Sequence, residues 1–143
     1  MVGDVIDAWP QPGDPGISSY AGAVINGLDG RNILLGTPGP DSITGGKDAD
    51  TLVGRGGGDT LNGGDGNNSY LPWPDLGGVP QLSNTTIQGG SGLDVVYLRG
   101  TRNDFSDTSG CSQAECTLSA KGGSLTMTNV NVLIFKDARV DLP

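Results

Sequence analysis

The feature that most constrains this chain is a nine-residue period. Reading from Gly27, five nonapeptides follow one another without a gap to Leu71, and a sixth runs from Gly89 to Tyr97. Glycine fills the first position of every copy, Asn or Asp the sixth, and a large apolar or aromatic residue the eighth. The sixth positions are Asn32, Asp41, Asp50, Asp59, Asn68 and Asp94, and the eighth are Leu34, Ile43, Leu52, Leu61, Tyr70 and Val96. Chance spacing of glycine would not also hold the other two positions in phase, so the period is a structural repeat.

Each copy divides into a turn and a strand. The first six residues are rich in glycine, which tolerates positive φ and tight curvature of the backbone. The last three form a short strand whose middle side chain, the eighth of the copy, points inward. Two copies make one coil, so residues two copies apart stack in neighbouring coils, about 4.8 Å from each other.

The stacked turns carry oxygen atoms at a spacing that suits calcium. A calcium–oxygen bond is about 2.3–2.6 Å long, so one cation fits midway between two turns that lie about 4.8 Å apart. Stacking arranges the sixth-position residues in two columns. We expect the column made only of Asp to bind calcium more tightly, because Asn supplies an oxygen without the charge. One column holds Asn32, Asp50 and Asn68, and the other holds Asp41, Asp59 and, if the interruption after Leu71 preserves the phase, Asp94.

The copies resemble the G-G-x-G-x-D-x-U-x repeat of RTX proteins, over about residues 27–71 and 89–97. They depart from it at position two in Leu28, Thr37 and Arg55, and at position four in Asp48. The resemblance implies an all-β fold, a right-handed parallel β-roll with a small antiparallel C-terminal cap. It also implies roughly two to four calcium ions that drive folding, and a bacterial protein of type I secretion, extracellular or at the cell surface.

Candidate calcium ligands are the six side chains at position six, together with exposed glycine carbonyls of the turns. Three further aspartates lie inside the turns: Asp29, Asp48 and Asp65. They either add negative potential near the ions or are solvated turn residues, and Asp48 is also a candidate ligand. The glycines whose carbonyls are candidate ligands are Gly36, Gly39, Gly45, Gly54, Gly57, Gly63, Gly66, Gly89 and Gly92. The alternative to calcium binding is a metal-free solenoid with glycine turns.

The rest of the chain divides around the repeats. Residues 1–26 are expected to be an extension or cap, with possible short strands at Val5–Ile6 and at 21–25; 27–97 are the roll and 98–143 a β cap. Pro72, Pro74 and Pro80 predict that 72–86 protrude as a loop, with Trp73 either anchoring a partner or stapling the loop to the roll. Ile87–Gln88 are expected to re-enter the roll. A hairpin turning at Gly122–Gly123, then strands within 129–135 and 138–142, would form the cap.

Cys111 and Cys116 are expected to form a short-range disulfide, which points to an oxidising compartment. Two free, partly buried thiols are the alternative. Further Cys or His would be needed for a metal site, and the chain has no histidine.

Composition narrows the function. The net charge of −8 and pI near 4.1 disfavour nucleic acid. Only 34% of residues are hydrophobic, too few for a conventional core, so ion binding is expected to contribute to folding. The lack of histidine rules out the H-E-x-x-H motif and His-dependent triads, and no catalytic role is expected. No membrane span and no N-terminal secretion signal are predicted.

Two non-enzymatic roles remain. The first is a calcium-dependent self-assembling or surface-layer component that associates with itself or with surface and matrix proteins. The second is an accessory module of a larger secreted enzyme or adhesin that binds a polysaccharide.

Overall fold

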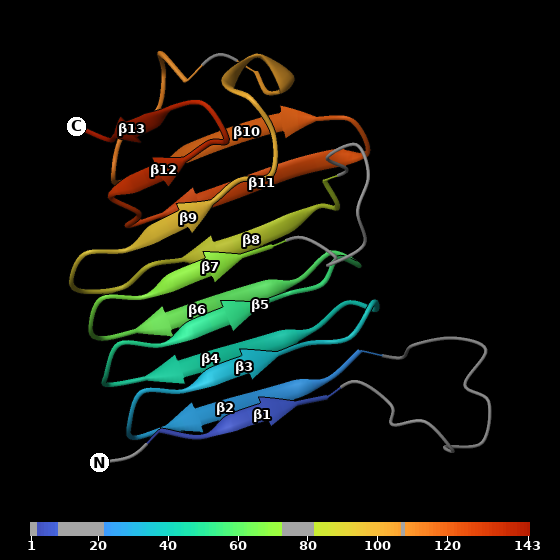
Figure 1. Ribbon diagram of the computed structural model, residues 1–143, viewed down its shortest axis with the longest axis vertical. Helices are drawn as coiled ribbons and strands as arrows, with labels where there is room; N and C mark the ends of the chain where they lie inside the picture. The colour runs from blue at the N-terminus through green and yellow to red at the C-terminus, as the bar shows by residue number, and fades with distance from the viewer. Residues whose placement is uncertain (1–2, 9–21, 73–81, 107) are drawn as a thin grey trace.

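The computed structural model describes residues 3–8, 22–72, 82–106 and 108–143, and within them the chain forms β-strands, turns and one short 3₁₀ helix, η1 (Arg102–Asp104) (Figure 1). The strands build two sheets around one core. The seven-stranded sheet runs, in spatial order, β1 (Val5–Asp7), β3 (Ile33–Leu35), β5 (Thr51–Val53), β7 (Ser69–Leu71), β9 (Val95–Tyr97), β12 (Val132–Ile134) and β13 (Arg139–Asp141). The six-stranded sheet runs β10 (Cys116–Ala120), β11 (Gly123–Thr128), β8 (Thr85–Gln88), β6 (Thr60–Gly64), β4 (Ser42–Gly46) and β2 (Val24–Leu28).

The repeats form a parallel β-roll, as the nine-residue period predicts. Consecutive strands alternate between the two sheets, so each coil contains two nonapeptides. Within one sheet the strands pair in parallel with an offset of 18 residues, for example Ile43 opposite Leu61 and Leu52 opposite Tyr70. These eighth-position side chains are fully buried, because alternate residues of a strand point to opposite faces and the middle residue faces the core.

The parallel pairing extends beyond residues 27–97 at both ends. At the N-terminal end, β1 pairs in parallel with β3 and β2 with β4, so the short strands expected there belong to the roll itself. At the C-terminal end, β11 continues the six-stranded sheet and β12 the seven-stranded sheet, both in parallel. Among the described strands, β10 and β13 alone pair antiparallel, each at one edge. A coil needs paired strands with one inward apolar residue, and Ile25 and Met127 provide such a residue without the glycine-rich turn.

The interruption after Leu71 is shorter than the expected 72–86. Thr85 and Thr86 lie in β8 together with Ile87 and Gln88, which confirms the re-entry of the chain at this point. Trp73, Pro74 and Pro80 lie outside the described residues, as do Pro10, Pro12 and Pro15.

The two edges of the roll differ in the length of their turns (Figure 1). The short-turn edge, on the left of the view, lies where strands of the six-stranded sheet lead into the seven-stranded sheet. Its turns are 29–32, 47–50, 65–68 and 129–131, together with 89–94, which is as long as the turns of the other edge. The long-turn edge, on the right, has turns 36–41 and 54–59 and the connection between β7 and β8. Each edge therefore presents one column of sixth-position residues.

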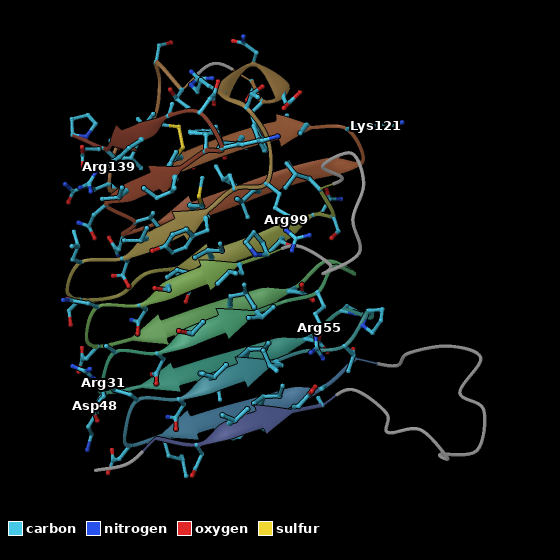
Figure 2. All side chains as sticks on the ribbon, viewed as in Figure 1. Arg31, Asp48, Arg55, Arg99, Lys121 and Arg139 are labelled. Carbon is cyan, nitrogen blue, oxygen red and sulfur yellow. A yellow bond between two sulfur atoms is a disulfide. The ribbon has the colours of Figure 1, made fainter. Side chains whose placement is uncertain are left out.

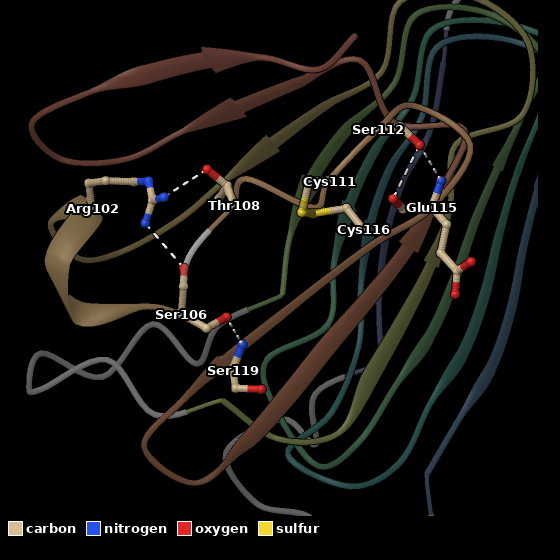
Figure 3. Close-up of a disulfide and its surroundings, with 8 residues drawn as sticks. All are labelled: Arg102, Ser106, Thr108, Cys111, Ser112, Glu115, Cys116 and Ser119. Atoms are coloured by element: carbon tan, nitrogen blue, oxygen red, sulfur yellow. Dashed lines mark hydrogen bonds between the residues drawn. A yellow bond between two sulfur atoms is a disulfide. The ribbon is translucent and has the colours of Figure 1, made fainter.

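At the C-terminal end the hydrophobic core includes two phenylalanine rings. The rings of Phe105 and Phe135 meet edge to face at 5.4 Å, and the Arg102 guanidinium lies 5.6 Å from the centre of the Phe135 ring. The expected disulfide joins Cys111 to Cys116 at the start of β10 (Figure 3). Both cysteines are buried, so the bridge belongs to the packing of this end.

Candidate metal centre

The short-turn edge is held by a ladder of side-chain oxygens. In each coil the backbone N–H of the sixth-position residue donates to the side-chain Oδ1 of the equivalent residue in the next coil. The donors and acceptors are Asp4 to Asn32 (2.9 Å), Asn32 to Asp50 (2.7 Å), Asp50 to Asn68 (2.9 Å), Asn68 to Asp94 (3.1 Å) and Asp94 to Asn131 (2.7 Å). Amides and carboxylates alternate along this column, so Asp50 and Asp94 each have a neutral amide on either side.

The long-turn edge repeats the arrangement over fewer coils. Ala23 N–H donates to Asp41 Oδ1 (2.6 Å) and Asp41 N–H to Asp59 Oδ1 (3.0 Å). Asp59 N–H then donates to the Thr85 hydroxyl oxygen (3.3 Å). Here two carboxylates are direct neighbours.

The expectation that Asp94 continues the Asp41–Asp59 column is wrong. Asp94 stacks on Asn68, which precedes it by 26 residues instead of the usual 18. The extra residues lie in the connection between β7 and β8, at the long-turn edge. They lengthen this coil, which still has one strand in each sheet. Thr85 takes the place beside Asp59 that sequence reasoning gave to Asp94.

Three ladder carboxylates have an oxygen to which no described group donates a hydrogen bond. Among the described residues, the Oδ2 atoms of Asp50, Asp59 and Asp94 are buried and have no hydrogen-bond partner. All three side chains are at most 2% exposed. A buried carboxylate oxygen without a donor carries a desolvation cost of several kcal/mol, so these atoms require a cation or a proton.

Burial perturbs the acidity of the same three groups. Desolvation raises the pKa of Asp59 to about 7, with a further upward effect from the neighbouring Asp41 carboxylate. Desolvation likewise raises the pKa of Asp94 to about 6 and raises that of Asp50. Backbone N–H donors in the ladder act in the opposite direction and only partly offset burial. Near neutral pH the calcium-free fold therefore holds incompletely ionised carboxyls that a bound cation would ionise.

Asp41 differs because the protein satisfies both of its oxygens. The Thr37 backbone N–H donates to Asp41 Oδ2 (2.6 Å) and the Thr37 hydroxyl to Oδ1 (2.9 Å). Close by, the Arg55 guanidinium donates to the Gly36 carbonyl (3.1 Å) and to Asp7 (2.7 Å) on the long-turn edge (Figure 2). Thr37 and Arg55 both replace the usual glycine at position two of the repeat. These departures from the repeat therefore lie close to Asp41, the ladder carboxylate that the protein satisfies by itself.

The ladder amides use their nitrogen atoms within the protein. Asn32 Nδ2 donates to the Gly30 carbonyl (2.9 Å), and Asn68 Nδ2 to the carbonyls of Asp65 and Gly66 at 3.4 Å each. Asn131 Nδ2 donates to the Gln113 side chain (3.1 Å). Among the described residues, the unpartnered oxygens are thus confined to the aspartates.

The glycine at position one leaves room for these oxygens. A Cβ built on Gly45 would lie 2.5 Å from both Asp50 Oδ2 and the Gly63 carbonyl oxygen. Cβ atoms built on Gly36, Gly54 and Gly89 would likewise collide with Asp41, Asp59 and the Asn129 carbonyl. Any side chain here would fill the cradle between a carboxylate and a carbonyl of the next coil.

Glycines at position four allow the turns themselves to stack. Gly57 lies against Gly39, Gly66 against Asp48, and Gly92 against Gly66, in each case too closely for a Cβ. Gly57, Gly66 and Gly92 also have positive φ, the conformation in which glycine is favoured. Asp48 is exposed, and its Oδ2 accepts the Gly30 N–H (2.8 Å).

The other two turn aspartates have partners of their own. Asp29 forms an exposed ion pair with Lys47 (3.5 Å), and Asp65 accepts the Ser91 hydroxyl (2.6 Å). Neither carboxylate is buried in the ladder.

The oxygen set fits calcium by its chemistry. Calcium takes six to eight oxygen ligands from carboxylates, carbonyls, amides and water, and the turns supply the first three kinds. Within the described ranges, no three Asp, Glu, His or Cys side chains cluster closely enough to hold a metal by themselves. The residues that would hold an ion are therefore Asp50, Asp59 and Asp94 with turn carbonyls of stacked coils, and the ion would supply the positive charge that their Oδ2 atoms lack.

Sequence reasoning found the six ladder residues but missed four groups that complete the columns. Asn131 and Thr85 lie outside any recognisable copy of the repeat, and only strand pairing brings them into line. Thr37 and Arg55 were visible as departures from glycine at position two, which was the one available signal.

A parallel β-roll with stacked Asp and Asn ladders and orphaned carboxylate oxygens defines a calcium-binding solenoid. Comparison with known families agrees: residues 26–61 and 35–70 match the RTX calcium-binding nonapeptide repeat, in four copies. Residues 26–70 of this chain are RTX calcium-binding repeats. No curated protein matches the chain.

Proposed function

We propose that this calcium-binding module folds on binding about three calcium ions, at the coils of Asp50, Asp59 and Asp94. The observation that carries the proposal is the set of three buried Oδ2 atoms without a partner. Each coil of the repeat buries only two large apolar side chains, such as Leu52 and Leu61, and this is little apolar burial for the backbone ordering of a coil. Ion binding then supplies folding energy.

The test is a calcium titration of protein prepared in chelator. The β-sheet circular dichroism signal should rise with calcium, and calorimetry should count about three ions per chain. An unchanged spectrum between excess chelator and millimolar calcium would refute calcium-driven folding, and a count of six would refute the assignment to unpartnered oxygens.

We further propose that the folded roll is extracellular and associates with a second copy through its N-terminal end. RTX repeats typically occur in secreted bacterial proteins. The strands β1 and β2 are the outer strands of the two sheets at this end, and an outer strand has backbone groups free to pair with another chain. Val5 and Val24 on these strands are 67% and 79% exposed, and Leu28 is 73% exposed. Among the described residues no strand pairs with this apolar edge, which favours a second copy as its partner.

Light scattering across a calcium titration tests this association. Val24→Lys places a charge on the outer strand and should abolish calcium-dependent association while leaving the calcium count unchanged. Leu93→Lys, at an exposed side chain of the short-turn edge, is the matched control and should associate like wild type. Monomers of the wild-type protein at millimolar calcium and high concentration would refute the proposal.

A second candidate function, polysaccharide binding, rests on one groove. It has a volume of about 250 Å³, and the residues that line it are apolar ones, the aromatic residues Tyr97 and Phe135, and two cations, Arg99 and Lys136. Aromatic rings and cations in one groove would suit an acidic sugar. Binding of an anionic polysaccharide that Lys136→Ala weakens, with calcium binding unchanged, would favour this role over self-association.

We propose no catalytic role for the chain. The support is that the buried carboxylates already serve the ladder, each accepting a backbone N–H from the neighbouring coil. Among the described residues, no helix has the length and apolar character to cross a membrane.

A further inference from the structure

The fifth copy of the repeat differs from its two predecessors at two positions at once. Asn68 stands at position six, where the preceding copies have Asp50 and Asp59, and Tyr70 stands at position eight, where they have leucine. Tyr70 is fully buried and stacks between Leu52 and Val96 in the seven-stranded sheet. Its ring fills the usual core position, so its hydroxyl extends past the point that a leucine reaches.

That hydroxyl lies among three oxygen acceptors of the next coil. Tyr70 Oη is 3.1 Å from the Gln88 carbonyl, 3.1 Å from the Gly89 carbonyl and 3.4 Å from Asp94 Oδ1. A hydroxyl has one proton to donate, so the acceptors outnumber the donor. Two carbonyl oxygens and one carboxylate oxygen that converge on one point are the kind of donor set that calcium uses.

The same hydroxyl occupies the cradle that stays open one coil earlier. A Cβ on Gly45 would meet Asp50 Oδ2 and the Gly63 carbonyl; on the equivalent Gly63 it would meet the Tyr70 hydroxyl and the Asn68 side-chain nitrogen. The cradle at Gly45 holds an unpartnered carboxylate oxygen. The cradle at Gly63 holds an amide and a hydroxyl, both neutral.

We propose that the Asn68 and Tyr70 side chains together take the place of a bound cation in this coil. The amide removes the negative charge that an ion would balance. The hydroxyl provides the proton that the facing oxygens need. The short-turn edge then binds ions only at Asp50 and Asp94, and the coil between them keeps its structure without calcium. This inference rests on the proposed calcium binding of the other coils.

The direct test is to restore the repeat. The double variant N68D/Y70L gives the fifth copy the residues of the third and fourth at these positions, and we expect it to bind one more calcium ion per chain than wild type. Calorimetric titration with calcium chloride and native mass spectrometry both count the ions. Tyr97→Phe, at a tyrosine on the outer surface that is 43% exposed, is the control and should keep the wild-type count.

The reciprocal graft covers the case in which N68D/Y70L does not fold. D50N/L52Y transfers the substitute to the third copy and should bind one ion fewer than wild type. It should also resist denaturant in excess chelator better than D50N alone, because the new hydroxyl fills the cradle.

The outcomes separate this inference from the proposed function. A folded N68D/Y70L with the wild-type ion count would overturn the inference while calcium binding stands. If D50N/L52Y is no more stable in chelator than D50N, the inference is overturned as well. If the wild-type protein binds no calcium, the proposed function itself fails.

Discussion

Replacing Asp59 by Asn should change the stability of this protein in opposite directions with and without calcium. Asp59 Oδ1 accepts the Asp41 N–H in the ladder, and an amide oxygen serves equally there, as Asn32 and Asn68 do at the other edge. Its Oδ2 is buried without a partner. Asp59→Asn therefore keeps the ladder bond and removes the unbalanced charge.

The magnitude follows from the pKa of Asp59. Burial raises this pKa to about 7 from an ordinary 3.8, which corresponds to about 4 kcal/mol of cost for the ionised form at pH 8. Solvent screening lowers the effective cost of a charge near the protein surface, so we expect the substitution to stabilise the calcium-free fold by about 2 kcal/mol. In calcium at about 1,000 times the Kd, loss of this site removes about 4.1 kcal/mol of binding energy. The gain of about 2 kcal/mol offsets part of this loss, so the net change in calcium should be a destabilisation of about 2 kcal/mol.

Asp41→Asn is the matched control on the same edge. The Asp41 Oδ2 atom accepts the Thr37 N–H at 2.6 Å, so an amide nitrogen at that place sets donor against donor. Leaving such a group unsatisfied costs about 1–3 kcal/mol, with or without calcium. Urea denaturation followed by circular dichroism, in chelator and in millimolar calcium, measures all four changes. If Asp59→Asn shifts stability in the same direction in both conditions, or behaves like Asp41→Asn, the assignment of the unpartnered oxygen to a cation is refuted.

Three further outcomes are expected. Since the folded pKa values of Asp59 and Asp94, about 7 and 6, exceed the ordinary 3.8, the calcium-free fold should be most stable below about pH 4 and lose stability as the pH rises through 6 to 7. Calcium affinity should increase over the same interval, since the ion binds carboxylates; calorimetry at pH 5 and 7.5 with equal affinities would contradict this. Removing the Cys111–Cys116 bridge with C111S/C116S should lower the free energy of unfolding by about 2 kcal/mol, through a less constrained unfolded chain, and intact mass with and without reductant confirms the bridge. Gly45→Ala should weaken calcium binding and cost about 1–3 kcal/mol of stability, whereas Gly110→Ala, where nothing lies within 4 Å of the added Cβ, should change neither.

The nine-residue period by itself determined the repeating part of this fold. Glycine at position one, Asp or Asn at position six and an apolar eighth residue define a turn and a three-residue strand wherever they recur. The strands Ile33–Leu35, Thr51–Val53 and Val95–Tyr97 lie at the end of their copies as the period predicts. Local sequence suffices for these features because the turn conformation and the alternation of side chains are set within each copy.

Tertiary structure alone decided which residues stack on one another. Asp94 stacks on Asn68 because all the extra residues of the interruption lie in the single connection between β7 and β8. No pattern in the sequence shows where the chain re-enters the sheet. Asn131 joined the same column for the same reason, through the pairing of β12 with β9. Register between strands depends on backbone hydrogen bonds over long separations, which local patterns do not encode.

The tertiary structure also decided which carboxylates need an ion. Asp41 and Asp59 occupy the same position in the second and fourth copies and are equivalent in sequence. Thr37 donates to Oδ2 of the first, whereas no described residue donates to Oδ2 of the second. The difference is physical: a carboxylate requires a cation only when burial removes water and no donor replaces it. Burial and donors both come from side chains that meet only once the coils have stacked.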